Sequence, residues 1–328
     1  MGETTDQPIL EVRNLTVEFP GRHGTVAALS DVSLNIRAGE ILGVVGESGA
    51  GKSMTGLAIQ GLLERPGHIS GGEIWLKGRR IDTLDDYEMQ KIRGREIGAI
   101  FQDPLTSLNP LFTVGAQLSE TIRQHLNMNK TQARARAVEL LGEVGIPSPD
   151  ERVNHYPHQF SGGMRQRVVI ALALAASPKL LIADEPTTAL DVSIQAQIIS
   201  LLRKLCKEKR TAVMLVTHDM GVIAEAADRV AVMYAGRLIE LGSVNQVLHA
   251  STHPYTRGLM ASIPALAARV ERLNQIDGSM PRPGAIPNGC AFNPRCKSTG
   301  PRCIRERPEL MPAGDGASAC WLNAGGIQ

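Results

Sequence analysis

Hydrophobic residues in this chain gather in short unbroken runs, and in some stretches they recur with helical spacing. Unbroken apolar runs predict strands buried on both faces of a parallel sheet, and two of them lie at residues 41–45 and 180–183; a third strand is predicted at residues 211–219, which end in polar residues. Residues 198–209 have the spacing of an amphipathic helix, which places Cys206 in the core. Such strands, separated by helical segments, predict an α/β fold.

No apolar stretch is long enough to cross a membrane. The best run, residues 168–176, ends at Ser177, Pro178 and Lys179, far short of the roughly 20 residues that a spanning helix needs. Residues 1–11 are polar and acidic, unlike a secretory signal. We therefore expect a protein kept in the cytosol, where clustered cysteines are metal ligands or redox groups more often than disulfides.

The composition and net charge of the chain are those of an ordinary globular protein. The chain has 328 residues, of which 43% are hydrophobic and 21% charged, enough for one large domain with a satellite or for two domains. A formal net charge of +2 gives no reason to expect nucleic acid as a partner.

A glycine-rich loop follows the first apolar run and opens a helical segment. Its spacing is that of a phosphate loop, in which glycines let successive N–H groups point at a phosphate at the positive end of a helix. Lys52 would reach the β- and γ-phosphates of ATP, and Ser53 would bind Mg²⁺. The candidate nucleotide contacts are Gly46, Glu47, Ser48, Gly49, Ala50, Gly51, Lys52, Ser53 and Met54.

Acidic and basic side chains stand at the ends of the two later apolar runs. Asp184 would hold Mg²⁺ through its water shell, and Glu185 would polarise the attacking water as a general base. His218 ends the third predicted strand, a position suited to the γ-phosphate. Together with the phosphate loop, these residues predict a nucleoside triphosphatase.

A second anion-binding helix start, with no phosphate loop of its own, lies at residues 161–166. At this point the sequence resembles the ATP-binding cassette proteins. Gln102 resembles the family's Q-loop glutamine, residues 189–191 its D-loop and His218 its switch histidine. The signature motif would bind ATP held by a partner subunit, through Ser161, Gly162, Gly163 and Met164.

The resemblance implies a fold and a mechanism. The fold is a mixed-sheet core with an antiparallel β subdomain and a helical subdomain, the latter at about residues 103–158. Two cassettes would close head to tail on ATP, Gln102 would sense the γ-phosphate and Mg²⁺, and residues 103–114 would receive a helix of a membrane partner. An aromatic ring usually stacks on the adenine in this family; Phe19 is the candidate, and His23 the alternative.

Other branches of the superfamily fit less well. No coiled coil separates Lys52 from Asp184, and a second cassette is absent from the sequence, which disfavours the chromosome-maintenance and translation-factor branches. Residues 101–110, 217–240 and 252–264 resemble the D-type ATPase of dipeptide, oligopeptide and nickel importers. That resemblance implies a heterodimer with an F-type ATPase, two integral membrane permease subunits, an external substrate-binding protein, and a peripheral location on the cytoplasmic face of the cell membrane.

Four of the five cysteines lie in the last 39 residues, spaced C-x5-C-x6-C-x16-C, at Cys290, Cys296, Cys303 and Cys320. Spacing alone leaves open an iron–sulfur cluster, zinc, which favours C-x2-C pairs, and free thiols. The resemblance to peptide-importer ATPases implies a [4Fe–4S] cluster at these positions, either as a structural staple or as a sensor. The basic residues among them would offset thiolate charge: Arg295, Lys297, Arg302, Arg305 and Arg307.

Two domains follow from these readings. Residues 1–250 form the nucleotide-binding cassette, and residues 251–328 a proline-rich extension with little regular structure. The function expected is ATP-driven import of dipeptides or oligopeptides. The alternatives are a nickel importer of the same family and a soluble, redox-controlled cassette ATPase.

Overall fold

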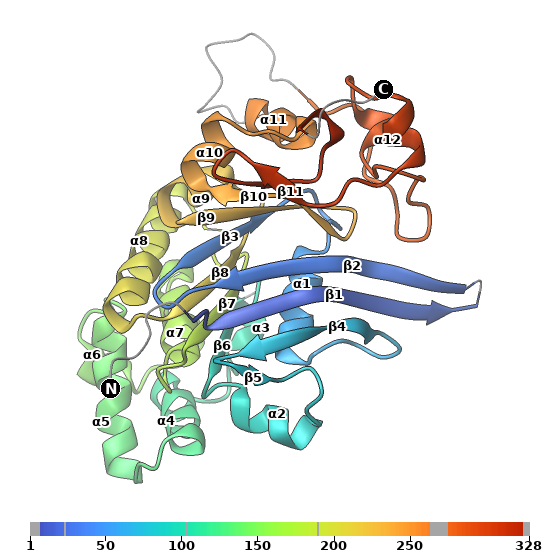
Figure 1. Ribbon diagram of the computed structural model, residues 1–328. Helices are drawn as coiled ribbons and strands as arrows, with labels where there is room; N and C mark the ends of the chain where they lie inside the picture. The colour runs from blue at the N-terminus through green and yellow to red at the C-terminus, as the bar shows by residue number, and fades with distance from the viewer. Residues whose placement is uncertain (1–6, 23, 103, 189, 263–274, 324–328) are drawn as a thin grey trace. The chain divides into compact units, whose positions relative to one another are not determined.

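The computed structural model describes residues 7–22, 24–102, 104–188, 190–262 and 275–323 (Figure 1). Its contacts divide the chain into two compact units, each assembled from separate segments. Unit 1 comprises residues 1–9, 36–41 and 83–215, and unit 2 comprises residues 10–35, 42–82 and 216–328.

The described strands of unit 1 are buried, and the sequence predicts the second and third of them. They are β6 (Ile97–Ile100), β7 (Leu180–Asp184) and β8 (Ala212–Val216), in the order β8-β7-β6. β6 and β7 run parallel, with Ile97 opposite Leu180. Because β7 and β8 are buried along almost their whole length, their residues are apolar without alternation.

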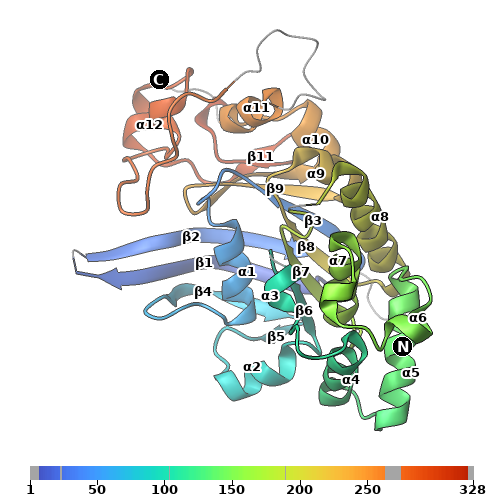
Figure 2. The same cartoon turned by 180° about the vertical axis from the view of Figure 1, so that it is seen from behind.

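Helices make up most of the rest of unit 1. They are α2 (Asp86–Ile92), α3 (Pro104–Ser107), α4 (Val114–His125), α5 (Lys130–Glu143), α6 (Pro149–Arg152), α7 (Gly162–Ala173) and α8 (Val192–Lys209), with a 3₁₀ turn at Pro157–Gln159. Both ribbon views place α4, α5 and α6 together at one end of the unit, within the range 103–158 (Figures 1 and 2).

Local sequence explains where these helices begin and which face is buried. Thr113 caps α4 by accepting a hydrogen bond from the Ala116 N–H, and Asn129 forms a reciprocal capping box with Gln132 at α5. Cys206 lies on the buried side of α8, 2% exposed, which confirms its predicted place in the core. No helix among the described residues is both long and apolar enough to cross a membrane.

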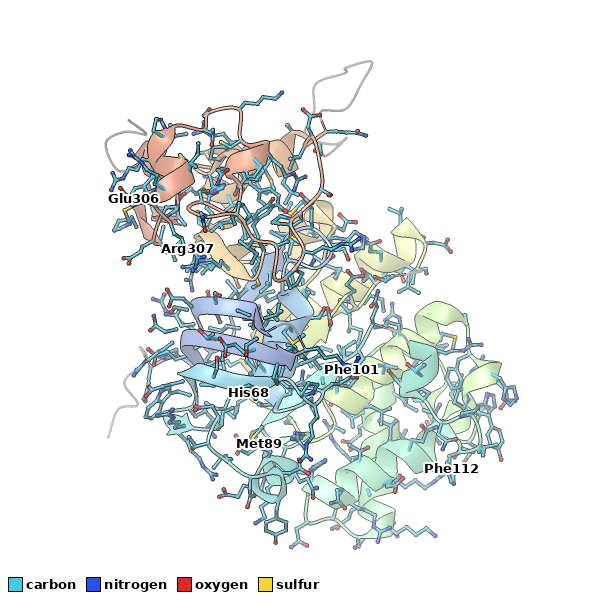
Figure 3. All side chains as sticks on the ribbon, turned by 90° about the vertical axis from the view of Figure 1, so that its right-hand side faces the viewer. His68, Met89, Phe101, Phe112, Glu306 and Arg307 are labelled. Carbon is cyan, nitrogen blue, oxygen red and sulfur yellow. The ribbon has the colours of Figure 1, made fainter. Side chains whose placement is uncertain are left out.

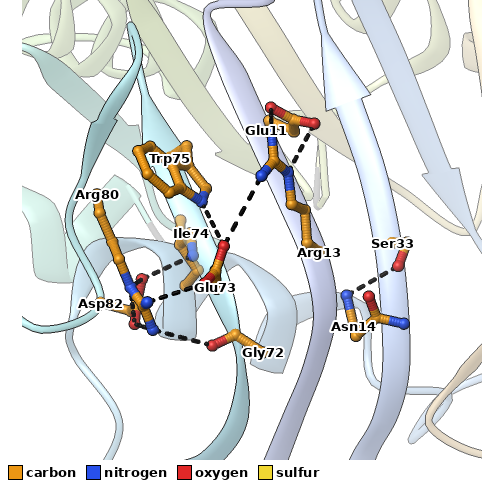
Figure 4. Close-up of polar contacts among 10 residues, drawn as sticks. All are labelled: Glu11, Arg13, Asn14, Ser33, Gly72, Glu73, Ile74, Trp75, Arg80 and Asp82. Carbon is orange, nitrogen blue, oxygen red and sulfur yellow. Dashed lines mark hydrogen bonds and ion pairs between the residues drawn. The ribbon is translucent and has the colours of Figure 1, made fainter.

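Unit 2 contains an antiparallel sheet with one polar face. Its strands, in the order β2-β1-β4-β5, are β1 (Leu10–Gly21), β2 (Gly24–Ile36), β4 (His68–Leu76) and β5 (Arg79–Arg80). Val12 lies opposite Ile74, and both are buried. On the other face Arg13 pairs with Glu11, and Arg80 with Glu73 and Asp82 (Figure 4). The alternation puts the apolar residues in the core and the arginines on the opposite face.

The second sheet of unit 2 is mixed and carries the phosphate loop. Its strands, in the order β11-β12-β10-β9-β3, are β3 (Ile41–Val45), β9 (Arg229–Tyr234), β10 (Arg237–Ser243), β11 (Met311–Ala313) and β12 (Gly316–Ser318). β3 runs parallel to β9, and β10 antiparallel to it. The helices are α1 (Lys52–Gln60), α9 (Met220–Ala226), α10 (Val244–His249), α11 (Pro254–Ala261) and α12 (Pro301–Arg305), with 3₁₀ turns at Asn293–Arg295 and Trp321–Asn323.

The expectation of little regular structure after residue 250 is wrong for residues 254–261 and for residues 301–318. β12 pairs with β10, with Ala317 opposite Leu241, so the last strands extend the sheet of the cassette. Pro301 occupies the first turn of α12, where its missing N–H costs no hydrogen bond. Pro312 lies in β11, at the edge of the sheet, where a strand proline is tolerated.

Candidate functional site

The phosphate loop connects β3 to α1, and its backbone needs glycine at several positions. Gly46, Gly49 and Gly51 have φ angles of 149°, 82° and 104°. A Cβ atom at Gly46 would collide with the Met233 carbonyl oxygen, and one at Gly51 would lie 2.6 Å from Leu29 Cδ2. The glycines therefore serve both the left-handed turn and the close approach of β9 and β2.

Lys52 is folded back over this loop. Its Nζ donates to the carbonyl oxygens of Gly46, at 2.9 Å, and Glu47, at 3.0 Å, and the residue is only 7% exposed. Ser48, Gly49 and Ser53 are exposed around it. The loop therefore presents backbone N–H groups, a hydroxyl and an ammonium group on one short segment, which is the donor set that a polyphosphate needs.

Glu47 of the loop has partners that the sequence did not reveal. Its N–H donates to the Tyr255 hydroxyl oxygen at 2.9 Å, and its carboxylate forms an ion pair with Arg295 at 3.0 Å. Glu47 remains a predicted nucleotide contact, but its side chain and N–H already bind residues near the C-terminus.

The end of β7 carries the predicted acidic pair. Asp184 is the last residue of the strand, and Glu185 follows with a φ angle of 48°. A left-handed conformation at a non-glycine residue costs about 1–3 kcal/mol and is found preferentially at functional sites. The surrounding turn therefore holds Glu185 in a fixed, strained orientation.

Two donors bind the Glu185 carboxylate at the same oxygen. Gln102 Nε2 donates to Oε2 at 3.2 Å, and Thr188 Oγ1 donates to it at 2.8 Å. The structure thus brings together Gln102 and Glu185, which sequence reasoning assigned separately. It also adds Thr188, a residue whose only sequence signal was its place three positions after the glutamate.

The predicted signature segment, residues 161–166, opens α7. Ser161 is the N-cap, and its Oγ accepts a hydrogen bond from the Met164 N–H at 3.4 Å. A Cβ at Gly163 would lie 2.6 Å from Ile194 Cγ2 on α8, whereas one at Gly162 would meet only Leu190 Cδ2, at 3.8 Å. Gly163 is therefore required for helix packing, and Gly162 leaves space open at the start of the helix.

His218 stands exposed between two residues that fix the turn after β8. Asp219 caps α9 by accepting from the Gly221 N–H at 2.7 Å, and its own N–H donates to Thr217 Oγ1 at 3.0 Å. The turn therefore places His218 two residues after the end of β8, and its role at the γ-phosphate stays a prediction.

The structure describes only some of the residues predicted for adenine stacking and for the D-loop. His23 and Ala189 lie outside them. Phe19 lies on β1, half-buried, and its ring packs so closely on the Gly67 backbone that a Cβ there would be 2.5 Å from two ring atoms. Phe19 remains the predicted stacking residue.

The four clustered cysteines line one pocket, which we call the cysteine pocket. It has an empty volume of about 310 Å³, and His253, Phe292 and Trp321 also contribute to its wall. Cys290, Cys296, Cys303 and Cys320 are all free thiols. Burial raises the pKa of the Cys290 thiol to about 11 and also raises the pKa values of Cys296 and Cys320.

Within the described ranges, no three His, Cys, Asp or Glu side chains are grouped so that they could hold a single metal ion. The four thiols nevertheless converge on one pocket from separate turns.

Comparison with known proteins identifies the family. Residues 29–188 match the ABC transporter family, and residues 239–303 match the oligopeptide/dipeptide transporter, C-terminal region. The oligopeptide transport ATP-binding protein OppD of Bacillus subtilis is 50% identical over 309 residues, covering 94% of this chain and 86% of the relative. The dipeptide transport ATP-binding protein DppD of Escherichia coli is 46% identical over 308 residues, covering 94% of each.

Solved structures agree with this assignment. The ATP-binding cassette MJ0796, determined as a dimer in a post-hydrolysis state with ADP and Pi, is 33% identical, with a TM-score of 0.64. The match covers 72% of this chain and 98% of that one. The chain belongs to the ABC transporter ATP-binding proteins, in the branch that carries the oligopeptide/dipeptide transporter C-terminal region.

Proposed function

We propose that this chain is the ATP-hydrolysing subunit that powers import of dipeptides or oligopeptides through an ABC transporter. The observation that carries the proposal is the similarity, along nearly the whole chain, to ATP-binding proteins named for oligopeptide and dipeptide transport. The match to the peptide-transporter C-terminal region favours peptides over nickel as the transported substrate, and a transporter subunit over a soluble switch.

The roles of the site residues follow from their chemistry. Lys52 would exchange its loop carbonyls for the β- and γ-phosphates, and Ser53, at the exposed start of α1, would bind Mg²⁺. Asp184 would hold Mg²⁺ through its water shell, and Gln102 would sense Mg²⁺ and the γ-phosphate. Glu185, held by Gln102 and Thr188, would accept a proton from the attacking water. His218 would contact the γ-phosphate. Bound Mg²⁺ would neutralise phosphate charge during hydrolysis.

The start of α7 would serve a second ATP. The open space beside Gly162, the Ser161 hydroxyl and the exposed first turn would face a nucleotide bound by a second cassette, with Met164 next to it. We propose an F-type ATPase as that partner. The dimer of the related cassette MJ0796 supports pairing of two such subunits.

Exposed apolar residues in unit 1 offer a contact for the membrane subunits. Leu111 is 79%, Phe112 54% and Phe101 45% exposed, and Figure 3 labels the two phenylalanines. Large apolar side chains in solvent, close together in sequence, are typical of binding surfaces. We propose that this segment receives a cytoplasmic helix of a permease subunit, which would place the chain on the cytoplasmic face of the membrane.

Reconstitution tests the proposed function. We expect the chain to copurify with a second ATPase and two permease subunits. In proteoliposomes with the external binding protein, ATP should drive uptake of a labelled dipeptide or pentapeptide. Uptake of ⁶³Ni²⁺ instead of peptide would assign the nickel alternative, and a chain found only in the cytosol, without permease subunits, would contradict a transport role.

We also propose that the cysteine pocket holds a [4Fe–4S] cluster that stabilises the C-terminal region. The support for the proposal is that the pocket brings together four thiols, the number that such a cluster needs. The thiolate ligands of the proposed cluster would be Cys290, Cys296, Cys303 and Cys320. Loss of the cluster would remove a crosslink between turns that are otherwise separate.

Metal analysis checks this proposal. Anaerobically purified protein should contain about four irons and four acid-labile sulfides per chain. Cys303→Ser should lower both by more than about half, because it removes one of four ligands. Cys206→Ala, at the buried cysteine of α8, is the matched control and should keep them. Zinc in stoichiometric amount, or iron that is unaffected by Cys303→Ser, would overturn the cluster.

A further inference from the structure

The phosphate loop is bound from outside the cassette core by residues near the C-terminus. The contact centres on Arg295, whose side chain is 7% exposed and whose Nη1 lies 3.0 and 3.1 Å from the two carboxylate oxygens of Glu47. These residues are 248 positions apart in the chain. A buried guanidinium with a carboxylate partner is well suited to fix the orientation of both groups.

Arg295 is itself held from several sides, so it is a rigid support. Its Nε donates to the Asp277 carbonyl oxygen at 2.8 Å, and its Nη2 to those of Ile276 and Gly278 at 3.4 and 3.3 Å. The guanidinium also lies within 6 Å of the ring centres of Tyr234 and Phe292, at 5.8 and 5.9 Å. Little freedom remains in the side chain.

Two further residues from the same region contact the loop. The Tyr255 hydroxyl oxygen accepts the Glu47 N–H at 2.9 Å, and Tyr255 is fully buried. Met280 covers Gly49: a Cβ there would lie 3.2 Å from the Met280 methyl carbon. Met280 also accepts, through its sulfur, a hydrogen bond from the Ala235 N–H. Three points of the C-terminal region therefore touch residues 47–49.

We propose that Arg295 is a positioning residue for ATP binding: through Glu47 it holds the phosphate loop in its nucleotide-binding form. The carbonyl oxygen of Glu47 accepts a hydrogen bond from Lys52, so a shift of Glu47 also moves the lysine that would meet the phosphates. Arg295 itself touches no reacting atom. The inference rests on the proposed ATP site.

The same short segment joins the loop to the cysteine pocket. Arg295 directly precedes Cys296, and Phe292, which packs edge-on against Tyr234 and Tyr255, lines that pocket. The residues that hold the phosphate loop therefore belong to the same folded segment as the cysteine pocket. Through these contacts, the C-terminal region would take part in ATP binding.

A double-mutant cycle on ATP affinity tests the proposal in the complex. Arg295→Ala and Glu47→Ala should each raise the Kd and KM for ATP about tenfold and change kcat less than about twofold, because the loop is misplaced while the base is intact. The double variant should also show about a tenfold rise, since both changes remove one interaction. Lys297→Ala, which removes an exposed cation two residues away, is the matched control and should leave both constants unchanged.

A milder variant keeps the test decisive if the alanine variants fold poorly. Tyr255→Phe removes only the hydroxyl that accepts the Glu47 N–H, and we expect a rise in KM of about threefold with an unchanged melting temperature. If Arg295→Ala protein folds and binds ATP with wild-type affinity, or if the effects in the cycle are additive, Arg295 is not a positioning residue. The proposed ATPase function would be unaffected by that result. Failure of the wild-type complex to bind ATP would instead remove the proposed function.

Discussion

Replacing Glu185 with glutamine should lower kcat for ATP hydrolysis by about 10²–10⁴-fold, because it removes a general base. Glutamine has nearly the same shape as glutamate, and its amide oxygen can still accept hydrogen bonds from Gln102 and Thr188. The strained backbone at this position is also kept. The variant should therefore lose basicity without losing the geometry of the turn.

Two measurements separate loss of the base from loss of the site. The Kd for Mg·ATP, from equilibrium binding, should stay within about threefold of wild type, while single-turnover hydrolysis falls by the full amount. Glu208→Gln, the same change at an exposed position of α8, is the control and should keep the wild-type rate. A Glu185→Gln variant that turns over at more than half the wild-type rate would exclude Glu185 as the base.

The order of apolar and polar residues along the chain was sufficient to predict strands that are buried on both faces. β3 matches its predicted strand residue for residue, β8 lies within its predicted range, and β7 extends the predicted range by one residue, Asp184, because strands buried on both faces are mostly apolar. The phosphate loop was also predictable, since its glycines are needed for φ angles and close contacts that other residues do not permit. These signals lie within a few neighbouring residues.

Contacts between distant segments could not be read from the sequence. The donors to Glu185 include Gln102, 83 positions earlier; the sequence analysis named both residues but did not predict the hydrogen bond between them. Arg295 was expected to offset thiolate charge, but its carboxylate partner is Glu47. Nothing local distinguishes Arg295 from Lys297, which is exposed, because the difference arises from how the C-terminal region folds back on the loop.

The short strands β11 and β12 illustrate a further limit. Each has three residues, too few for an alternating pattern, and one contains a proline. They form strands because the edge of β10 offers backbone groups to pair with, as at Leu241 and Ala317. Their structure is determined by the partner strand more than by their own sequence.

Replacing Lys52 with alanine should weaken ATP binding by at least about 100-fold, which corresponds to roughly 2.7 kcal/mol. The variant lacks the ammonium group that would contact two phosphates. Those contacts would be charge-assisted hydrogen bonds made by a buried residue. The change also removes the donor to the Gly46 and Glu47 carbonyl oxygens, so the empty loop loses two of its own hydrogen bonds. Both effects act in the same direction.

Two further lysine variants show whether the charge of Lys52 is the cause of the weaker ATP binding. Lys204→Ala removes an exposed lysine of α8 and should leave the Kd for ATP unchanged. Lys52→Arg keeps the charge, but its planar guanidinium does not fit between the two carbonyls, so it should restore affinity only in part. If Lys52→Ala bound ATP within about threefold of wild type while it remained folded, the phosphates would have to lie elsewhere. Because Gly46, Glu47 and Lys52 form one hydrogen-bonded unit, that result would remove the whole loop from the ATP site.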